Sequence, residues 1–100
     1  MTITEVKEGE ELRLVVEGRV DTNTSPELQD RILKSFQKAS NLTLDLEKTA
    51  YISSAGLRAL LLGHKTARSK GGSLAITNVT DAVMEIFEVT GFADILDIRH

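Results

Sequence analysis

The sequence predicts a single α/β domain over residues 1–100, with a mixed, mostly parallel sheet of four to five strands and helices mainly on one face. Segments 12–20 and 42–46 alternate apolar and polar residues with the period of two that is typical of half-buried strands. Three further segments have apolar residues at helical spacing and stand between strands. The inferred order is ββαβαβα(β), so strands separated by helices must run parallel.

Two strands and a helix open the chain. Residues 2–7 form a first strand, and a turn at Gly9 returns the chain into the strand at 12–20, which favours a hairpin. A polar loop follows at 21–25. Thr24 or Ser25 then caps a helix that has Pro26 in its first turn, and Glu27 completes a capping box if Thr24 is the cap. The helix leads into the strand at 42–46.

The second helix follows the segment Ser53-Ser54-Ala55-Gly56 and extends to about Ser69, where Gly71–Gly72 ends it. Its inner face is predicted to consist of four residues at helical spacing: Leu57, Leu60, Leu61 and His64.

The last third of the chain predicts a strand, a helix and a final short strand. Leu74 and Ile76 mark the first of these strands, and residues 95–98 the last. Thr80 or Asn78 caps the helix between them, which Gly91 ends. Parallel strands covered on both faces read as continuous apolar runs, whereas the strands here alternate. We therefore expect the second face of the sheet to be partly exposed.

Composition excludes several classes of protein. The chain is 41% hydrophobic, has a net charge of −3 and contains no cysteine. Its longest apolar run, 59–62, is too short for a spanning helix of ~20 residues or for the apolar part of a secretory signal. Acidic and basic residues are interspersed, without the basic patch that binds nucleic acid. We expect a cytoplasmic protein that neither inserts into membranes nor binds nucleic acid.

The segment with the clearest chemical content runs from Tyr51 to Leu57. The strand at 42–46 leads there, through a short connection, into the start of a helix, where unpaired N–H groups and the helix dipole favour a capping hydroxyl or a phosphate. Ser53 and Ser54 both supply a hydroxyl at that point. On local chemistry alone, the simplest interpretation is that one of them is the N-cap of the helix, since Ser is a standard cap.

Catalytic, metal-binding and nucleotide-binding sites are not predicted. His64 lies ten residues after Ser54, about 15 Å along a helix, and His100 is the last residue, so neither suits a serine nucleophile. Two separated histidines and scattered carboxylates give no metal-ligand spacing, and Gly71–Gly72 lacks the sequence of a phosphate-binding loop. No cofactor is expected. In the simplest interpretation, Asp21 begins a turn and Asp45 points outward from its strand. Alternatively, both lie at the same edge of the sheet as Ser54.

Ser53-Ser54-Ala55-Gly56-Leu57 resembles the Asp-Ser-x-Gly-Leu motif of the STAS domain, and in particular of the bacterial anti-sigma factor antagonists. The resemblance extends over essentially the whole chain. It includes Glu17-Gly18-Arg19-Val20-Asp21 at the end of the second strand, Thr24 and Leu28, Leu44-Asp45-Leu46, Gly71-Gly72-Ser73-Leu74, Ile86-Phe87 and Thr90-Gly91-Phe92. The chain departs from the family at Ser53, where the family has Asp.

The resemblance implies a protein-binding switch and not an enzyme. In this family the motif serine, here Ser54, is phosphorylated by a serine kinase that is also the anti-sigma factor. The unphosphorylated antagonist binds that kinase and releases the sigma factor, and a PP2C-type phosphatase resets the cycle. Ser53 is a second candidate acceptor. The implied partner-binding residues are Asp21, Thr22, Asn23, Thr24, Ser53, Ser54, Ala55, Gly56, Leu57 and Arg58.

Two alternative functions stay open. Within the fold, the chain could be a STAS subunit of a lipid-transport or stress-sensing assembly that has no phosphate cycle. In another class, it could be a small nucleotide-binding protein. The chain also ends at His100, where many members of the family continue into a final helix. A face left uncovered in this way would suit a homodimer.

Overall fold

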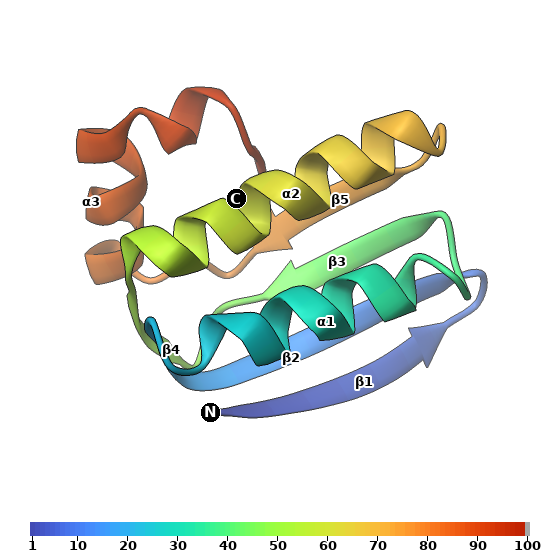
Figure 1. The fold of residues 1–100 in the computed structure, drawn as a ribbon, viewed down its shortest axis with the longest axis horizontal. Coiled ribbons are helices and arrows are strands. Elements are labelled where there is room, and N and C mark those ends of the chain that lie inside the picture. Colours follow the sequence, from blue (N-terminus) through green and yellow to red (C-terminus); the bar gives the residue numbers. More distant parts are fainter. Residues whose placement is uncertain (100) are drawn as a thin grey trace.

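The structure, a computed structural model that describes residues 1–99, is an α/β fold with one mixed six-stranded sheet (Figure 1). The predicted fold class is confirmed. The main path of the sheet has the order β1-β2-β3-β5-β6, and β4 pairs with β2 outside that path. The elements are β1 (Thr2–Glu8), β2 (Glu11–Val20), α1 (Ser25–Ser35), β3 (Asn41–Asp45), β4 (Thr49–Ile52), α2 (Ser54–Ser69), β5 (Ser73–Thr77), α3 (Asp81–Thr90), the 3-10 helix η1 (Phe92–Asp94) and β6 (Asp97–Arg99).

Strand directions agree with the sequence prediction. β1 and β2 form the expected antiparallel hairpin, and the other strand pairs are all parallel. In the centre of the sheet, Leu14 lies beside Leu44, which in turn lies beside Ile76. All three side chains are fully buried. The alternating leucines that predicted these strands therefore line one continuous core row beneath the helices.

β2 changes partner halfway along its length. Its first half, 11–15, pairs with β3, and its second half, 18–20, pairs with β4. Between the two, the carbonyl oxygen of Val16 accepts a hydrogen bond of 2.8 Å from the buried Thr49 hydroxyl. A side chain of β4 thus binds a backbone acceptor of β2 in the interval between the segments that pair with β3 and with β4. The register shifts between Gly18 and Arg19, opposite the extra residue Ala50 of β4.

The sequence analysis did not predict β4 as a strand. The bulge at Ala50 breaks the alternation on which strand prediction depends, and the burial pattern over the four residues is accordingly buried, exposed, exposed, buried. The sheet therefore has six strands in place of the four to five expected.

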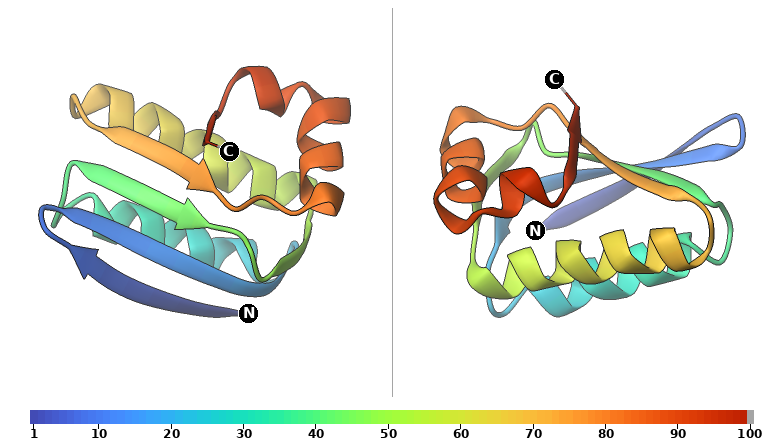
Figure 2. Two further views of the ribbon diagram at one scale, coloured as in Figure 1. Left: turned by 180° about the vertical axis from the view of Figure 1, so that it is seen from behind. Right: turned by 90° about the horizontal axis from the view of Figure 1, so that it is seen from above.

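Helices α1 and α2 lie side by side on one face of the sheet, whereas α3 lies at the end of the sheet, near β4 (Figure 2). The buried face of α2 includes Leu57, Leu60 and Gly63. Leu61 and His64, also predicted on the inner face, are only partly buried, and Gly63 is the buried residue at that turn. A Cβ on Gly63 would lie 2.9 Å from side-chain atoms of Ile32 and Leu74, so α2 approaches α1 and β5 too closely for a larger residue.

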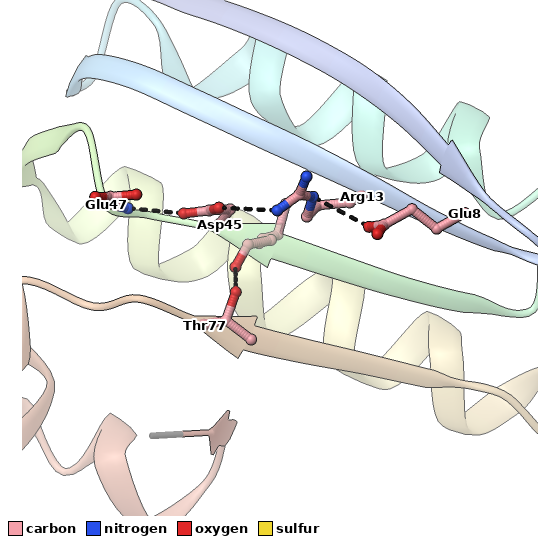
Figure 3. A network of polar contacts seen from close by, with 6 residues as sticks. Glu8, Arg13, Asp45, Glu47 and Thr77 are labelled. Carbon is pink, nitrogen blue, oxygen red and sulfur yellow. Dashed lines mark hydrogen bonds and ion pairs between the residues drawn. The ribbon is translucent and has the colours of Figure 1, made fainter.

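Within the described residues 1–99, no helix covers the centre of the opposite face of the sheet, as predicted. That face nevertheless contains a buried carboxylate (Figure 3). Asp45 was expected to be an outward strand residue, but it is only 5% exposed. Its Oδ2 pairs with Arg13 Nη1 at 3.5 Å, and Arg13 Nε lies 3.1 Å from Glu8 Oε1. Asp45 Oδ1 accepts from the Glu47 N–H at 3.0 Å. Asp45 therefore fixes the turn where β3 leaves β2, and it does not join the sheet edge near Ser54.

The last helix begins and ends as predicted. Thr80 is the N-cap of α3, since its hydroxyl accepts from the Val83 N–H at 3.3 Å. Gly91 ends the helix with φ of 81°, a left-handed conformation that glycine adopts without strain. Within residues 1–99, no helix combines the length and apolar character needed to cross a bilayer. His100, weighed above as a catalytic base, lies outside the described residues.

Candidate functional site

The two segments predicted to form the site lie together at one end of the sheet. Arg19 pairs with Tyr51 and Val20 with Ile52, so β2 and β4 end side by side. The Ser53 N–H donates to the Val20 carbonyl oxygen at 2.8 Å, which extends the pairing by one more bond. Asp21, which follows β2, and Ser53, which follows β4, are therefore held at adjacent positions. The carboxyl ends of these two parallel strands lie together in Figure 1.

The loop after β2 is organised around Asp21. One carboxylate oxygen, Oδ1, accepts from the Asn23 N–H at 2.9 Å and from the Thr24 N–H at 3.0 Å. The Thr24 hydroxyl donates to the Arg19 carbonyl oxygen and accepts from the Asp21 N–H, both at 2.9 Å. The bond from the Thr24 N–H, assisted by the Asn23 N–H, by the Thr24 hydroxyl 3.2 Å from Oδ1 and by the charge of Arg19, holds the pKa of Asp21 below its ordinary value. Asp21 is thus an anchored carboxylate at neutral pH.

The predicted cap of α1 is wrong in its chemistry. Thr24 occupies the N-cap position, but its side chain makes no capping hydrogen bond, and the capping box with Glu27 does not form. The hydroxyl is already used within the Asp21 loop. A local sequence pattern could not reveal this competition, because the alternative acceptor is the carbonyl oxygen of Arg19, in the preceding strand.

The two serines have different environments. Ser53 is the N-cap of α2, and its Oγ accepts from the Gly56 N–H at 3.3 Å. Ser54 is the first residue of the helix and is exposed. Among residues 1–99, no hydrogen bond to the Ser54 hydroxyl is found. The cap interpretation therefore holds for Ser53, while Ser54 presents a free hydroxyl at a helix N-terminus.

The rest of the motif positions α2. Gly56 and Leu57 are buried, so they hold the helix start in place and offer little surface to a partner. Ala55 and Arg58 line an open groove between α1 and α2, opposite Pro26 and Leu33. Of the residues predicted to bind a partner, the accessible ones are Thr22, Asn23, Ser54 and Arg58, with Asp21, Thr24, Ser53 and Ala55 partly accessible.

Sequence reasoning missed one feature of this surface. The Arg19 guanidinium lies over the Tyr51 ring, 4.5 Å from its centroid, and Tyr51 is 36% exposed. Such a cation–π contact holds an exposed aromatic side chain in one orientation. Arg19 and Tyr51 each stand one residue before the end of their strands, β2 and β4. The sequence could place both at the same end of the sheet only if β4 had been predicted as a strand.

The site contains no arrangement for covalent catalysis. The imidazole of His64 is on the third turn of α2 after Ser54, and no base contacts the Ser54 hydroxyl among the described residues. No group of three or more His, Cys, Asp or Glu side chains within residues 1–99 is placed to hold a metal ion. What the geometry offers is an accessible hydroxyl beside a rigid loop, which suits modification and protein contact.

Comparison with known protein families agrees with this geometry. Residues 3–97 match the family model described as "Mlab, STAS domain". The chain belongs to the STAS-domain family. The anti-sigma-B factor antagonist of Bacillus subtilis is 27% identical to this STAS chain over 95 residues, which cover 94% of this chain and 87% of the relative.

Solved structures show the same STAS fold. The anti-sigma factor antagonist SpoIIAA in its unphosphorylated form superposes with a TM-score of 0.81 at 15% identity, covering 99% of this chain and 89% of that one. The Bacillus cell fate determinant SpoIIAA in its phosphorylated form gives a TM-score of 0.75 at 14% identity, covering 99% and 92%.

Proposed function

We propose that this STAS chain is an anti-sigma factor antagonist, a protein-binding switch set by phosphorylation of Ser54 and not an enzyme. In its unphosphorylated form it binds an anti-sigma factor that is also a serine kinase, and the sigma factor is released. A PP2C-type phosphatase restores that form. The proposal is supported by relatives named anti-sigma-B factor antagonists that match nearly the whole chain. The observation that carries it is the Ser54 hydroxyl, which is exposed beside the Asp21 loop and makes no hydrogen bond within residues 1–99.

The choice of Ser54 over Ser53 follows from accessibility. A kinase must reach the hydroxyl oxygen and place it in line with the transferred phosphoryl group. Ser53 is half-buried and its oxygen accepts the capping bond from Gly56, whereas Ser54 is exposed and free of such a bond.

The partner surface we propose consists of the Asp21–Thr24 loop, Ser53–Ala55 and Arg58, with Gly56 and Leu57 positioning it. A phosphate on Ser54 adds about −1.5 to −2 charge in the middle of this surface. At an interface that must exclude water, that charge and its bulk oppose association. Binding would therefore be lost through the interface while the fold stays intact.

The experiment is a titration of the anti-sigma factor from the same organism with wild type, Ser54→Ala and Ser54→Asp, together with phosphosite mapping by mass spectrometry. We expect Ser54→Ala to bind like wild type and to resist phosphorylation, and Ser54→Asp to bind more weakly. Equal affinity of all three for a permanent partner would instead favour a STAS subunit without a phosphate cycle. Phosphate that persists in Ser54→Ala and disappears in Ser53→Ala would move the acceptor to Ser53.

A further inference from the structure

The helix that begins at Ser54 has an unusual charge distribution. α2 contains three basic residues, Arg58, Lys65 and Arg68, and no acidic residue. Within residues 1–99, none of the three forms an ion pair, whereas Lys34 on the neighbouring α1 pairs with Asp30 at 3.0 Å. A carboxylate of the neighbouring helix, Asp30, lines the same groove as Arg58 but forms its ion pair with Lys34. The three basic side chains of α2 are thus left without an ion-pair partner among residues 1–99, although the whole chain has a net charge of −3.

Two of these basic residues share a stripe with Ser54. Ser54, Arg58, Leu62 and Lys65 follow one another at intervals of four, four and three residues, the spacing that places side chains on one helix face. Arg58 and Lys65 are exposed, and Leu62 is 37% exposed between them. An accessible leucine flanked by two unpaired cations is the complement of a surface with an apolar side chain and carboxylates beside it.

Arg58 occupies a second position of interest. It lines the open groove between α1 and α2 together with Ala55, so this stripe is continuous with the surface proposed above for the anti-sigma factor. It is also four residues, about one helical turn or ~6 Å of rise, beyond Ser54. A phosphate on Ser54 and a carboxylate of a bound partner would therefore both be within reach of the same guanidinium group.

We propose that the outer face of α2, formed by Arg58, Leu62 and Lys65, docks an acidic segment of the anti-sigma factor with an apolar side chain against Leu62, and that Ser54 phosphate weakens this docking by engaging Arg58. The inference rests on the proposed function and names the chemistry of its partner. A guanidinium binds a phosphate through two parallel charge-assisted hydrogen bonds, so an engaged Arg58 no longer faces the partner. The switch then acts by withdrawing a contact as well as by adding charge.

The docking face is tested by affinity measurements with the anti-sigma factor that binds wild type. Leu62→Ala and Lys65→Glu should each weaken binding by about tenfold, the usual scale for an anchor residue or a reversed interfacial charge. The matched controls are Val89→Ala, an exposed apolar residue on α3, and Lys7→Glu on β1. Both controls should keep wild-type affinity. Unchanged affinity in the two α2 variants would overturn the docking face while leaving the proposed function standing.

The role of Arg58 is tested without any partner. Phosphoserine is placed at position 54 by genetic encoding, and the second ionisation of its phosphate is followed by phosphorus NMR. Engagement of Arg58 favours the dianion, so that pKa should be lower in wild type than in Arg58→Gln. Identical titration curves would overturn the engagement.

Partner affinity completes a double-mutant cycle. If Ser54 phosphate acts through Arg58, it should reduce the affinity of wild type by a larger factor than that of Arg58→Gln. An equal reduction in both would show that the phosphate acts by its own bulk and charge. If wild type binds no anti-sigma factor at all, the proposed function fails, and the docking face fails with it.

Discussion

Gly56 of α2 packs directly against Val20, the last residue of β2. A Cβ on Gly56 would lie 2.8 Å from Val20 Cγ1 and 3.3 Å from the Val20 carbonyl oxygen. Val20 is fully buried, and its branched side chain has few alternative rotamers. The start of α2, and with it Ser54, is therefore positioned by contact with the strand that leads into the Asp21 loop.

Gly56→Ala should consequently weaken partner binding as well as stability. We expect a loss of about 1 kcal/mol in the free energy of unfolding, because overpacking by ~1–3 kcal/mol exceeds the gain in helix propensity. Gly72→Ala is the control: its Cβ would fall 1.8 Å from the Ser40 carbonyl oxygen, at the other end of α2. It should destabilise at least as much, yet spare affinity well below its melting temperature. Equal affinity losses would mean that stability alone explains the effect.

Phosphorylation of Ser54 should leave the domain as stable as before or slightly more stable. Ser54 is the first residue of α2, where free N–H groups and the helix dipole favour negative charge by ~0.3–1 kcal/mol. The measurement is thermal unfolding of the phosphoserine form beside the unmodified chain. A melting temperature several degrees lower would identify the switch as a conformational one.

The pKa of Asp21 predicts a dependence on acid. Its folded-state pKa lies below the ordinary value, chiefly through the bond from the Thr24 N–H. Its stabilising contribution is thus complete above about pH 4, and it is lost as the pH falls through the lowered pKa. The stability difference between wild type and Asp21→Asn should shrink in that range. Carboxyl NMR should also show a partial rise of the pKa in Thr24→Val, which keeps the backbone donor. No rise would mean that the hydroxyl contributes nothing.

Asp45 has two separable roles that two substitutions distinguish. Asp45→Ala leaves the Glu47 N–H without its acceptor and removes one of the two carboxylates paired with Arg13, the other being Glu8, so we expect a loss of about 2 kcal/mol in unfolding free energy. Asp45→Asn retains an acceptor for the Glu47 N–H and should lose less than about 1 kcal/mol, since the partner charge of Arg13 is partly solvated. Urea unfolding of both variants measures this. Similar losses of unfolding free energy in both variants would assign the contribution of Asp45 to its ion pair with Arg13, which both substitutions remove.

Much of the fold could be predicted because its signals are local. The leucine alternation in β2 and β3, Thr80 at the start of α3 and Gly91 at its end each depend on a few neighbouring residues. Asp45 was misjudged because the Arg13 side chain that shields it is 32 residues away in the sequence. The strand β4 was missed for a similar reason, since a bulge is defined only by the partner strand.

For the candidate site, too, some features could be predicted from the sequence and others could not. The adjacency of the Asp21 and Ser54 segments was predictable, because parallel strands bring their carboxyl ends to one edge. Which serine would cap the helix was not, since either hydroxyl satisfies the same local pattern. Nor could the sequence alone pair Arg19 with Tyr51, which meet only through the shifted register of β2 and β4.

The attachment of β4 affects how the two ends of the molecule fluctuate. β4 has four residues, one strand neighbour and a register shift, whereas β3 is paired on both sides along its length. Amide protons of β4 should therefore exchange with solvent by small openings that do not require global unfolding. Amide protons in the centre of β3 should exchange only when the whole domain opens. The end of the sheet that contains Ser54 can thus open locally when a kinase binds it, while the leucine core remains folded.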